Sequence, residues 1–188
     1  MNEREGHFSQ TFTGRRFYPG QPTPEDVQIE DVAHALSNLC RFGGHCLRFY
    51  SVAQHSVLVS LLVPEHLALH GLLHDAAEAY LGDVIWPVRR VIERSSPVLE
   101  QLHGLADVAV RLKFGLRDLA PHEAKELKRA DLVALATERR DVMRETDHVW
   151  PILDGVAPDD EPIEPWTPRG AKTVFLDRFI ELTKGGRR

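Results

Sequence analysis

Apolar residues recur every three or four positions along most of the chain, which is the spacing of one face of an α-helix. No segment shows the strict alternation of apolar and polar residues that marks a half-buried strand. Ser51 and Pro64 stand where two of the helical patterns begin, and both residue types are common at helix starts. The pattern therefore predicts an all-α fold, with helices over residues 31–40, 52–63, 64–81, 88–93, 97–114, 121–144 and 168–184.

Two segments lack this pattern. Glycine and proline recur too often over residues 1–28 for a long helix, so we expect an extended segment there, which its aromatic side chains could hold against the body. Residues 150–166 are rich in Pro, Asp and Glu, which is typical of a surface loop. The 188 residues suit one domain, with an extended N-terminal segment (1–28), a helical core (29–147), and a late loop and helix (148–188).

Three of the predicted helices carry ionisable residues on faces that are otherwise apolar. Burying one unpaired charge costs several kcal/mol, against a total folding stability of about 5–15 kcal/mol. Such residues on separate helices therefore need a common compensating group. They are His55 in the helix 52–63, His70, His74 and Glu78 in the helix 64–81, with Asp75 beside them, and Asp131 and Glu138 in the helix 121–144.

A divalent cation bound by two imidazoles and two carboxylates would compensate all of these charges at once. Periodicity alone leaves simpler explanations open, because a lone core histidine is more often hydrogen-bonded than a metal ligand. Asp131 could also pair with Lys128 or Arg129. His70 and His74 have the spacing of a zinc site, but the chain lacks the Glu of His-Glu-x-x-His, so metalloprotease chemistry is not indicated.

Composition narrows the class of protein further. A net charge of −5 argues against a large nucleic-acid interface. The longest apolar run, near residues 57–63, is far short of the ~20 residues that span a bilayer, and the polar start is unlike a secretory signal, so we expect no membrane partner. Cys40 and Cys46 cannot form a disulfide framework and are interpreted as reduced thiols of a cytoplasmic protein.

The candidate residues occur in the order His…His-Asp…Asp, namely His55, His74-Asp75 and Asp131. They lie in the segments YSVAQHSV (50–57), GLLHDAAEAYLGD (71–83) and KRADL (128–132). This ordered set resembles the HD-domain metal-dependent phosphohydrolases. Within them, the chain is similar to bacterial 5′-deoxynucleotidases and to the compact phage and bacterial hydrolases that include dATP triphosphohydrolases.

The resemblance implies a compact HD-domain helical bundle that holds one divalent ion, which could be Mn, Co, Zn, Fe, Ni or Mg. It implies that His55, His74, Asp75 and Asp131 are the ligands. It also implies catalytic roles for two acids: Glu78 matches the general acid/base, and Asp83 matches an acid that activates water or orients the site.

Candidate substrate contacts follow from the same resemblance. Arg41 matches a phosphate-binding residue, and Phe42 stands where the deoxynucleotidases have Trp. Arg89 falls near the position of a phosphate-facing Lys in relatives. Trp86 and Pro87, just after the central motif, are candidates for contact with a base or sugar, although a packing role for Trp86 fits equally well.

We therefore expect hydrolysis of the 5′-phosphoester of 2′-deoxynucleotides. A monophosphate would give deoxynucleoside and phosphate, and a triphosphate such as dATP would give deoxynucleoside and tripolyphosphate, with a second Mg²⁺ on the substrate. Because relatives form dimers or larger assemblies, a homo-oligomer is expected. The alternatives are a non-catalytic nucleotide sensor, a protein-interaction domain, and a hydrolase of cyclic or hyperphosphorylated nucleotides. The complete motif argues against the first two and the short chain against the third.

Overall fold

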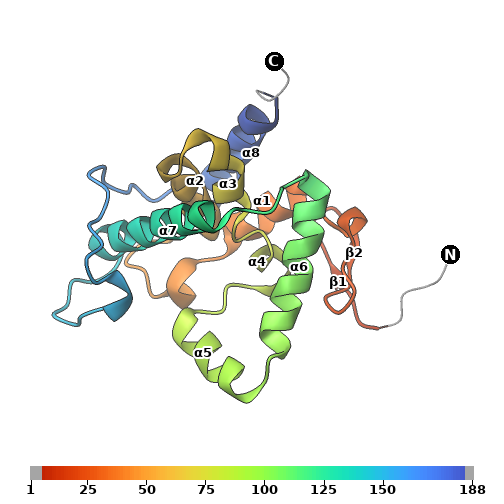
Figure 1. The fold of residues 1–188 in the computed structure, drawn as a ribbon, viewed down its shortest axis with the longest axis horizontal. Coiled ribbons are helices and arrows are strands. Elements are labelled where there is room, and N and C mark those ends of the chain that lie inside the picture. Colours follow the sequence, from red (N-terminus) through yellow and green to blue (C-terminus); the bar gives the residue numbers. More distant parts are fainter. Residues whose placement is uncertain (1–5, 185–188) are drawn as a thin grey trace.

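Helices account for nearly all regular structure in the computed structural model, which describes residues 6–184 (Figure 1). The prediction of an all-α fold is confirmed. The helices are α1 (Ile29–Asn38), α2 (Val52–Leu62), α3 (Ala68–Leu73), α4 (Glu78–Leu81), α5 (Trp86–Ser95), α6 (Val98–Phe114), α7 (Pro121–Asp141) and α8 (Pro168–Lys184).

The core forms around α2, which packs against α1, α3, α7 and α8. The helix carries apolar residues of its own on every face, as in helices enclosed by others. Among them Val52, Ala53 and Val59 are fully buried. Ser51 caps the helix as predicted, because its hydroxyl accepts a hydrogen bond from the Gln54 amide. The centre of the molecule is therefore a well-packed helix that also carries His55.

The single helix predicted over residues 64–81 is wrong. The chain instead forms a 3₁₀ turn (Glu65–Leu67), then α3, then a tight turn over residues 74–77, then α4. Within that turn the amide of Ala76 donates to the Leu73 carbonyl, and that of Glu78 donates to Asp75. These three-residue hydrogen bonds replace the four-residue bonds of an α-helix. Local apolar spacing does not reveal the change of pitch.

Within the predicted N-terminal segment, residues 9–17 form a small hairpin rather than a plain extended chain, and residues 1–5 lie outside the described residues. Strands β1 (Ser9–Gln10) and β2 (Arg16–Phe17) pair antiparallel, which corrects the expectation of no strands. As expected, an aromatic residue anchors the segment: Phe17 is fully buried and stacks on Tyr80 of α4, with ring centroids 4.0 Å apart. Two-residue strands are too short to show an alternating pattern in the sequence.

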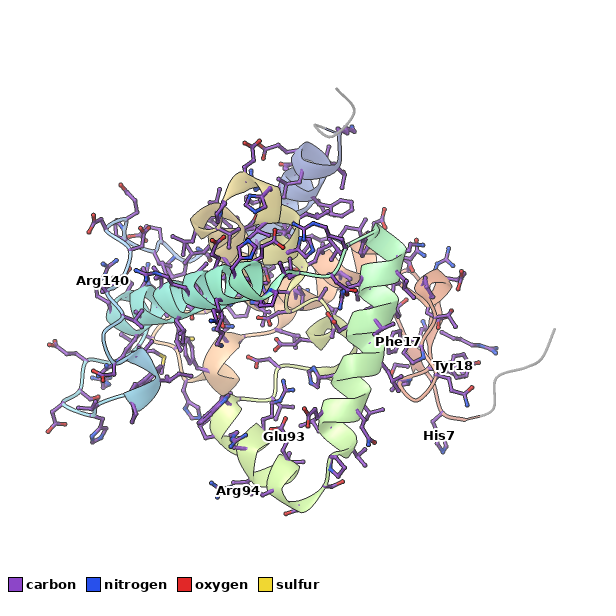
Figure 2. The ribbon with its side chains drawn as sticks, in the orientation of Figure 1. His7, Phe17, Tyr18, Glu93, Arg94 and Arg140 are labelled. Atoms are coloured by element: carbon purple, nitrogen blue, oxygen red, sulfur yellow. The ribbon has the colours of Figure 1, made fainter. Side chains whose placement is uncertain are left out.

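The late loop over residues 150–166 runs over the surface as predicted but is tied to the core. Arg140, at the end of α7, donates to the Asp159 carbonyl at 2.6 Å (Figure 2). The Gln54 side chain on α2 donates to the Glu164 carbonyl at 2.8 Å. The loop thus covers one side of the α2–α7 contact.

Helices α5 and α6 form an arm beside this core (Figure 1). No residue of α5 is buried, and its apolar side chains Val88, Val91 and Ile92 are at least 40% exposed. None of the helices within residues 6–184 combines the length and hydropathy that a membrane crossing requires. Within this arm, α6 packs into the core through Ala106, Ala109 and Val110, whereas α5 buries no side chain.

The close approach of α2 and α3 at Gly71 generates a stability prediction. A Cβ atom at Gly71 would lie 2.9 Å from the Ser60 Cα, so Gly71→Ala forces backbone apart and should lower the free energy of unfolding by about 1–3 kcal/mol. Gly104→Ala in α6 meets no atom within 4 Å and should be neutral or stabilising by up to about 1 kcal/mol. Urea unfolding followed by circular dichroism measures both. Equal stability of the two variants would contradict the close-approach explanation.

Candidate metal centre

The four predicted ligands come together where α2, α3 and α7 meet. His55 lies on α2, His74 and Asp75 follow the end of α3, and Asp131 lies on α7. The His55 Nε2 is 3.3 Å from the His74 Nε2 and 3.3 Å from an Asp131 oxygen. The Asp75 Oδ2 is 3.5 Å from the His55 Nε2 and 3.1 Å from the His74 Nε2. Residues from three separate helices therefore face one point.

The geometry of His55, His74 and Asp131 fits a metal ion, since one ligand atom from each lies within 4.8 Å of the others. The Nδ1–H of His55 donates to Glu138 at 2.6 Å, and the Nδ1–H of His74 donates to the Gly71 carbonyl at 2.8 Å. Both rings therefore turn the Nε2 lone pair to the centre. Two lone pairs at 3.3 Å repel each other unless a proton or a metal ion lies between them. The cluster could thus hold a metal ion.

The acids of the cluster are ionised at neutral pH. Burial alone would raise the pKa of Asp75, but the His74 and His55 rings and the Arg41 guanidinium hold it well below its usual range. Burial likewise opposes ionisation of Asp131, and the hydrogen bond and charge of His55 reverse the effect and keep its pKa low. Two negative charges therefore face the imidazoles, as a divalent cation requires.

His55 carries the opposite shift. Burial and Arg41 lower its pKa, but Glu138 and Asp131 outweigh them and raise it to about 9. In the absence of a metal ion, the ring is therefore protonated at neutral pH. A metal ion would have to displace that proton, because only the neutral imidazole is a ligand.

Asp131 pairs with Lys128, as the simpler explanation predicted, and also takes part in the cluster. Its Oδ2 is 2.8 Å from the Lys128 ammonium, while its Oδ1 faces His55. The ion pair leaves one oxygen directed at the centre. His70, the other histidine of the α3 stripe, lies outside the cluster and contacts the Arg117 carbonyl through Nε2 at 3.0 Å.

Glu78, the predicted general acid/base, opens α4 and lines the same pocket as His74 and Asp75. Its buried Oε2 has no hydrogen-bond partner among residues 6–184. Burial, followed by the charges of Asp75 and Asp83, raises its pKa to about 9. Asp83 follows α4, and burial with Asp75 raises its pKa as well. Glu78 thus shares a pocket with the candidate ligands His74 and Asp75, as a carboxyl group that retains its proton at neutral pH.

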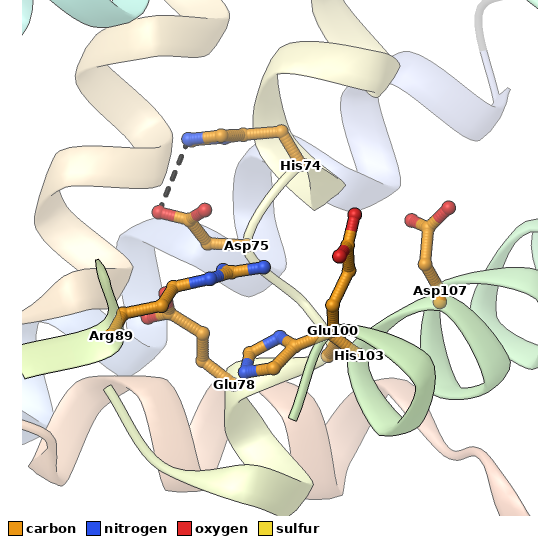
Figure 3. A pocket seen from close by; sticks show the side chains of 9 residues that line it. His74, Asp75, Glu78, Arg89, Glu100, His103 and Asp107 are labelled. Carbon is orange, nitrogen blue, oxygen red and sulfur yellow. Dashed lines mark ion pairs between the residues drawn. The ribbon is translucent and has the colours of Figure 1, made fainter. Parts of the chain in front are cut away.

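A pocket of about 290 Å³ adjoins the cluster, and side chains from α4, α5 and α6 point into it (Figure 3). The predicted contact Arg89 lines it, with its Nε 2.6 Å from Glu93 on the same helix. Its lining residues are His74, Asp75, Ala77, Glu78, Arg89, Glu100, His103, Gly104 and Asp107. Two of the candidate ligands, His74 and Asp75, therefore open onto the same space as the candidate acid Glu78.

The α6 wall of the pocket was not predicted. His103 has a buried Nε2 with no hydrogen-bond partner within residues 6–184, and burial with the Arg89 charge lowers its pKa. Glu100, His103 and Asp107 recur every three or four residues on one face of α6. That polar stripe was the available signal, but it is indistinguishable in sequence from a solvated helix face.

Arg41 reaches the centre from the loop before α2. Its Nε and Nη2 donate to Glu138 at 3.2 and 3.0 Å, and its Nη1 lies 3.8 Å from Asp75. Burial opposes its charge, but Glu138 and Asp75 raise its pKa above the usual value. The next residue, Phe42, has a positive φ of 56°, so the chain turns sharply after Arg41. The prediction of a cation near the cluster is thus consistent with the geometry.

The remaining predicted contacts lie outside the pocket lining. The Phe42 ring packs near Trp150, with centroids 6.1 Å apart. Trp86 is 60% exposed at the start of α5 under the Arg90 guanidinium, and Pro87 beside it is also exposed. The structure therefore brings Arg41 and Arg89 to the site but leaves Phe42, Trp86 and Pro87 at its margin.

Glu138 is a buried acid of the site, and the sequence analysis did not predict its role there. It is fully buried on α7, and it binds His55 through Oε1 and Arg41 through Oε2. Periodicity placed it on the stripe of Asp131, seven residues earlier. That position was the available signal, because a carboxylate two turns along the same face can reach the same centre.

Two proteins are similar to this chain over much of its length. The uncharacterized protein YfdR of Escherichia coli (strain K12) is 40% identical over 178 residues, which cover 94% of this chain and 96% of that protein. The uncharacterized protein RCAP_rcc00048 of Rhodobacter capsulatus is 38% identical over 140 residues, which cover 69% and 70% of the two chains. No family model matches the chain.

The cluster predicts that divalent ions stabilise the fold. At a free Mn²⁺ concentration of 100 times the dissociation constant, the expected gain is about 2.7 kcal/mol. Asp75→Ala should remove this gain, because one of the facing carboxylates is lost. Asp107→Ala, which lines the pocket away from the cluster, should keep it. Thermal unfolding with and without Mn²⁺ measures the effect, and an equal shift for both variants would contradict the ligand assignment.

Proposed function

The chain belongs to the family of the Escherichia coli protein YfdR, and we propose that it is a divalent-metal-dependent phosphohydrolase that cleaves the 5′-phosphoester of 2′-deoxynucleotides. The observation that carries this proposal is the convergence of His55, His74, Asp75 and Asp131 beside a pocket that also contains an unpartnered carboxyl group. The resemblance of this ordered set to HD-domain phosphohydrolases supplies the reaction class.

The four ligands would hold a Mn, Co, Zn, Fe, Ni or Mg ion with two neutral imidazoles and two carboxylates. When bound, such an ion lowers the pKa of a bound water toward ~7 and polarises a phosphoryl oxygen. Both carboxylates approach the His55 Nε2, Asp131 from α7 and Asp75 from the turn after α3. The ligand set is thus held by separate elements of the core.

Glu78 would protonate the leaving oxygen. Its pKa near 9 means that the carboxyl group holds a proton at neutral pH. Its buried Oε2 has no hydrogen-bond partner within residues 6–184, so the proton is not engaged by another side chain there. A general acid of this kind contributes about 10²–10⁴-fold to a rate. Asp83, whose negative charge helps to raise the Glu78 pKa, would support this role.

Arg41 and Arg89 would offset charge on the phosphoryl oxygens. Arg41 has Nη1 beside Asp75, and Arg89 reaches the pocket from α5 (Figure 3). Guanidinium groups suit this role because their donors form a planar fork. Phe42, Trp86 and Pro87, at the margin of the pocket, would contact the base or sugar only with a substrate that extends over the α5 end.

The charge of the pocket favours a monophosphate over a triphosphate. Besides the candidate ligand Asp75, and with Glu78 protonated, the lining includes the acids Glu100 and Asp107, against the single guanidinium of Arg89. A polyphosphate chain would be repelled there unless Mg²⁺ accompanied it. The acidic α6 wall suits the hydroxyl and amino groups of a nucleoside, which donate hydrogen bonds to carboxylates.

Product analysis tests the reaction and the substrate class together. Metal-stripped protein is incubated with Mn²⁺, Co²⁺, Mg²⁺ or Zn²⁺ and panels of deoxynucleoside mono- and triphosphates. We expect deoxynucleoside and free phosphate from the monophosphates. Tripolyphosphate would identify a triphosphohydrolase, and no product with any ion would contradict the proposed function. Sedimentation of the same samples tests the expected homo-oligomer.

Glu78→Gln should separate proton transfer from metal binding. The amide keeps the size of the side chain but cannot supply the proton, so kcat should fall about 10²–10⁴-fold with the metal affinity unchanged. Glu100→Gln is the matched control for kcat, because it changes an acid of the same pocket that would contact the nucleoside and not the leaving oxygen. Steady-state kinetics and calorimetric Mn²⁺ titration measure the two quantities. Full activity of the Glu78 variant would show that the acid lies elsewhere.

A further inference from the structure

The carboxylate of Glu138 joins the candidate metal centre to the candidate phosphate contact. Its Oε1 accepts a hydrogen bond from the His55 Nδ1 at 2.6 Å. Its Oε2 accepts from the Arg41 Nε at 3.2 Å and Nη2 at 3.0 Å. The Glu138 side chain is fully buried, the His55 side chain is too, and the Arg41 side chain is 13% exposed. One enclosed carboxylate therefore sets the orientation of both partners.

Folding stability does not account for this arrangement. A buried ion pair is often no more stabilising than apolar side chains of the same volume, because desolvation of the charges offsets their attraction. Ala134, one turn earlier on α7, and Thr137, the preceding residue, are also fully buried, so the helix packs small side chains in the core as well. A carboxylate at this position can accept hydrogen bonds from His55 and Arg41, which an apolar residue cannot do.

The consequence for His55 is a fixed ring. With Nδ1–H held by Glu138, the ring can only turn Nε2 toward His74, Asp75 and Asp131. A carboxylate on the far nitrogen also makes the imidazole a stronger ligand, and loss of such a partner typically costs 10–100-fold in metal affinity.

The consequence for Arg41 is a fixed guanidinium. Two of its nitrogen atoms are bound to Glu138, which leaves Nη1 on the side of Asp75 at 3.8 Å. The free edge of the fork is thereby directed at the cluster. Arg41 begins a short 3₁₀ turn (Arg41–Gly44), and its hydrogen bonds to Glu138, which are shorter than its 3.8 Å approach to Asp75, hold this side chain in place.

We propose that Glu138 is a positioning residue that holds His55 for the metal ion and Arg41 for the phosphoryl group at the same time. The proposal rests on the proposed function for the Arg41 half, while the His55 half concerns metal affinity alone. Glu138 does not touch substrate or metal. It acts through its two partners, so its removal changes metal affinity and substrate KM together.

The test compares Glu138→Gln with Glu123→Gln. Glu123 is the matched control, because it is another buried glutamate of α7 that binds a guanidinium, that of Arg117, away from the centre. The glutamine at 138 keeps the volume but loses the charge, and its amide nitrogen can accept from neither His55 nor Arg41. Unfolding temperature and circular dichroism verify that each variant is folded.

We expect Glu138→Gln to weaken Co²⁺ or Mn²⁺ binding 10–100-fold in calorimetric titrations without substrate, and to raise KM in kinetics at saturating metal. Glu123→Gln should change neither quantity. Arg41→Ala should raise KM with little effect on metal affinity, and the double variant should raise KM no further than Arg41→Ala does. If Glu138→Gln does not fold, Glu138→Asp, which withdraws the carboxylate by one methylene, is measured in the same way.

Unchanged metal affinity in a folded Glu138 variant would overturn the proposal, and so would KM effects of Glu138 and Arg41 that simply add. Failure of the proposed function has a different signature. Wild-type protein would bind the ion with an affinity that depends on Glu138 and yet release no product from any deoxynucleotide. A wild-type chain that binds no divalent ion would overturn both.

Discussion

The hydrogen bond between His55 and Glu138 joins the two helices on which the candidate site depends. Both side chains are fully buried, and their atoms approach to 2.6 Å. A charged carboxylate can occupy this place only because Arg41 and the imidazole surround it, and the imidazole in turn carries a raised pKa because of that carboxylate. Removing one partner would leave the other as an uncompensated buried charge, which typically costs 3–5 kcal/mol. The packing of α2 against α7 and the direction of the ligand atoms are therefore set by the same contact.

The helices with a long apolar stripe could be predicted from the sequence to within a few residues. The helix over residues 168–184 agrees at both ends, and that over 121–144 ends three residues early at Asp141. The tight turn at 74–77 could not be predicted, because the apolar residues on either side keep a spacing that suits one continuous helix. The N-terminal hairpin could not be predicted either, since its stability comes from Phe17 stacking on Tyr80, sixty-three residues later, rather than from its own strands.

The site followed from the sequence where a charge interrupts an apolar face. His55, His74 and Asp131 could be identified as a group because each would be costly to bury alone. Glu138 met the same criterion, but its partners come from a loop and from another helix, and spacing within α7 does not reveal them. His103 met no such criterion, because the sequence of its helix face is that of a solvated face. That face becomes part of a pocket only when α5 and α6 fold beside α4.

The two sides of the site differ in how many buried residues support them. The candidate metal ligands lie on and beside α2, α3 and α7, where fully buried residues such as Val59 and Ala134 fix the backbone. The opposite side is built on α5, which buries no residue, and on the polar face of α6. A metal ion requires ligand atoms at set distances, and the well-packed helices α2, α3 and α7 can hold ligand atoms in that way. Nucleotides differ in base and in phosphate number. Arg89 stands on the exposed helix α5, and His103 stands on the polar face of α6, whose other face packs into the core through Ala106, Ala109 and Val110. Substrate choice can thus change through α5 and α6 while the ligand geometry stays as it is.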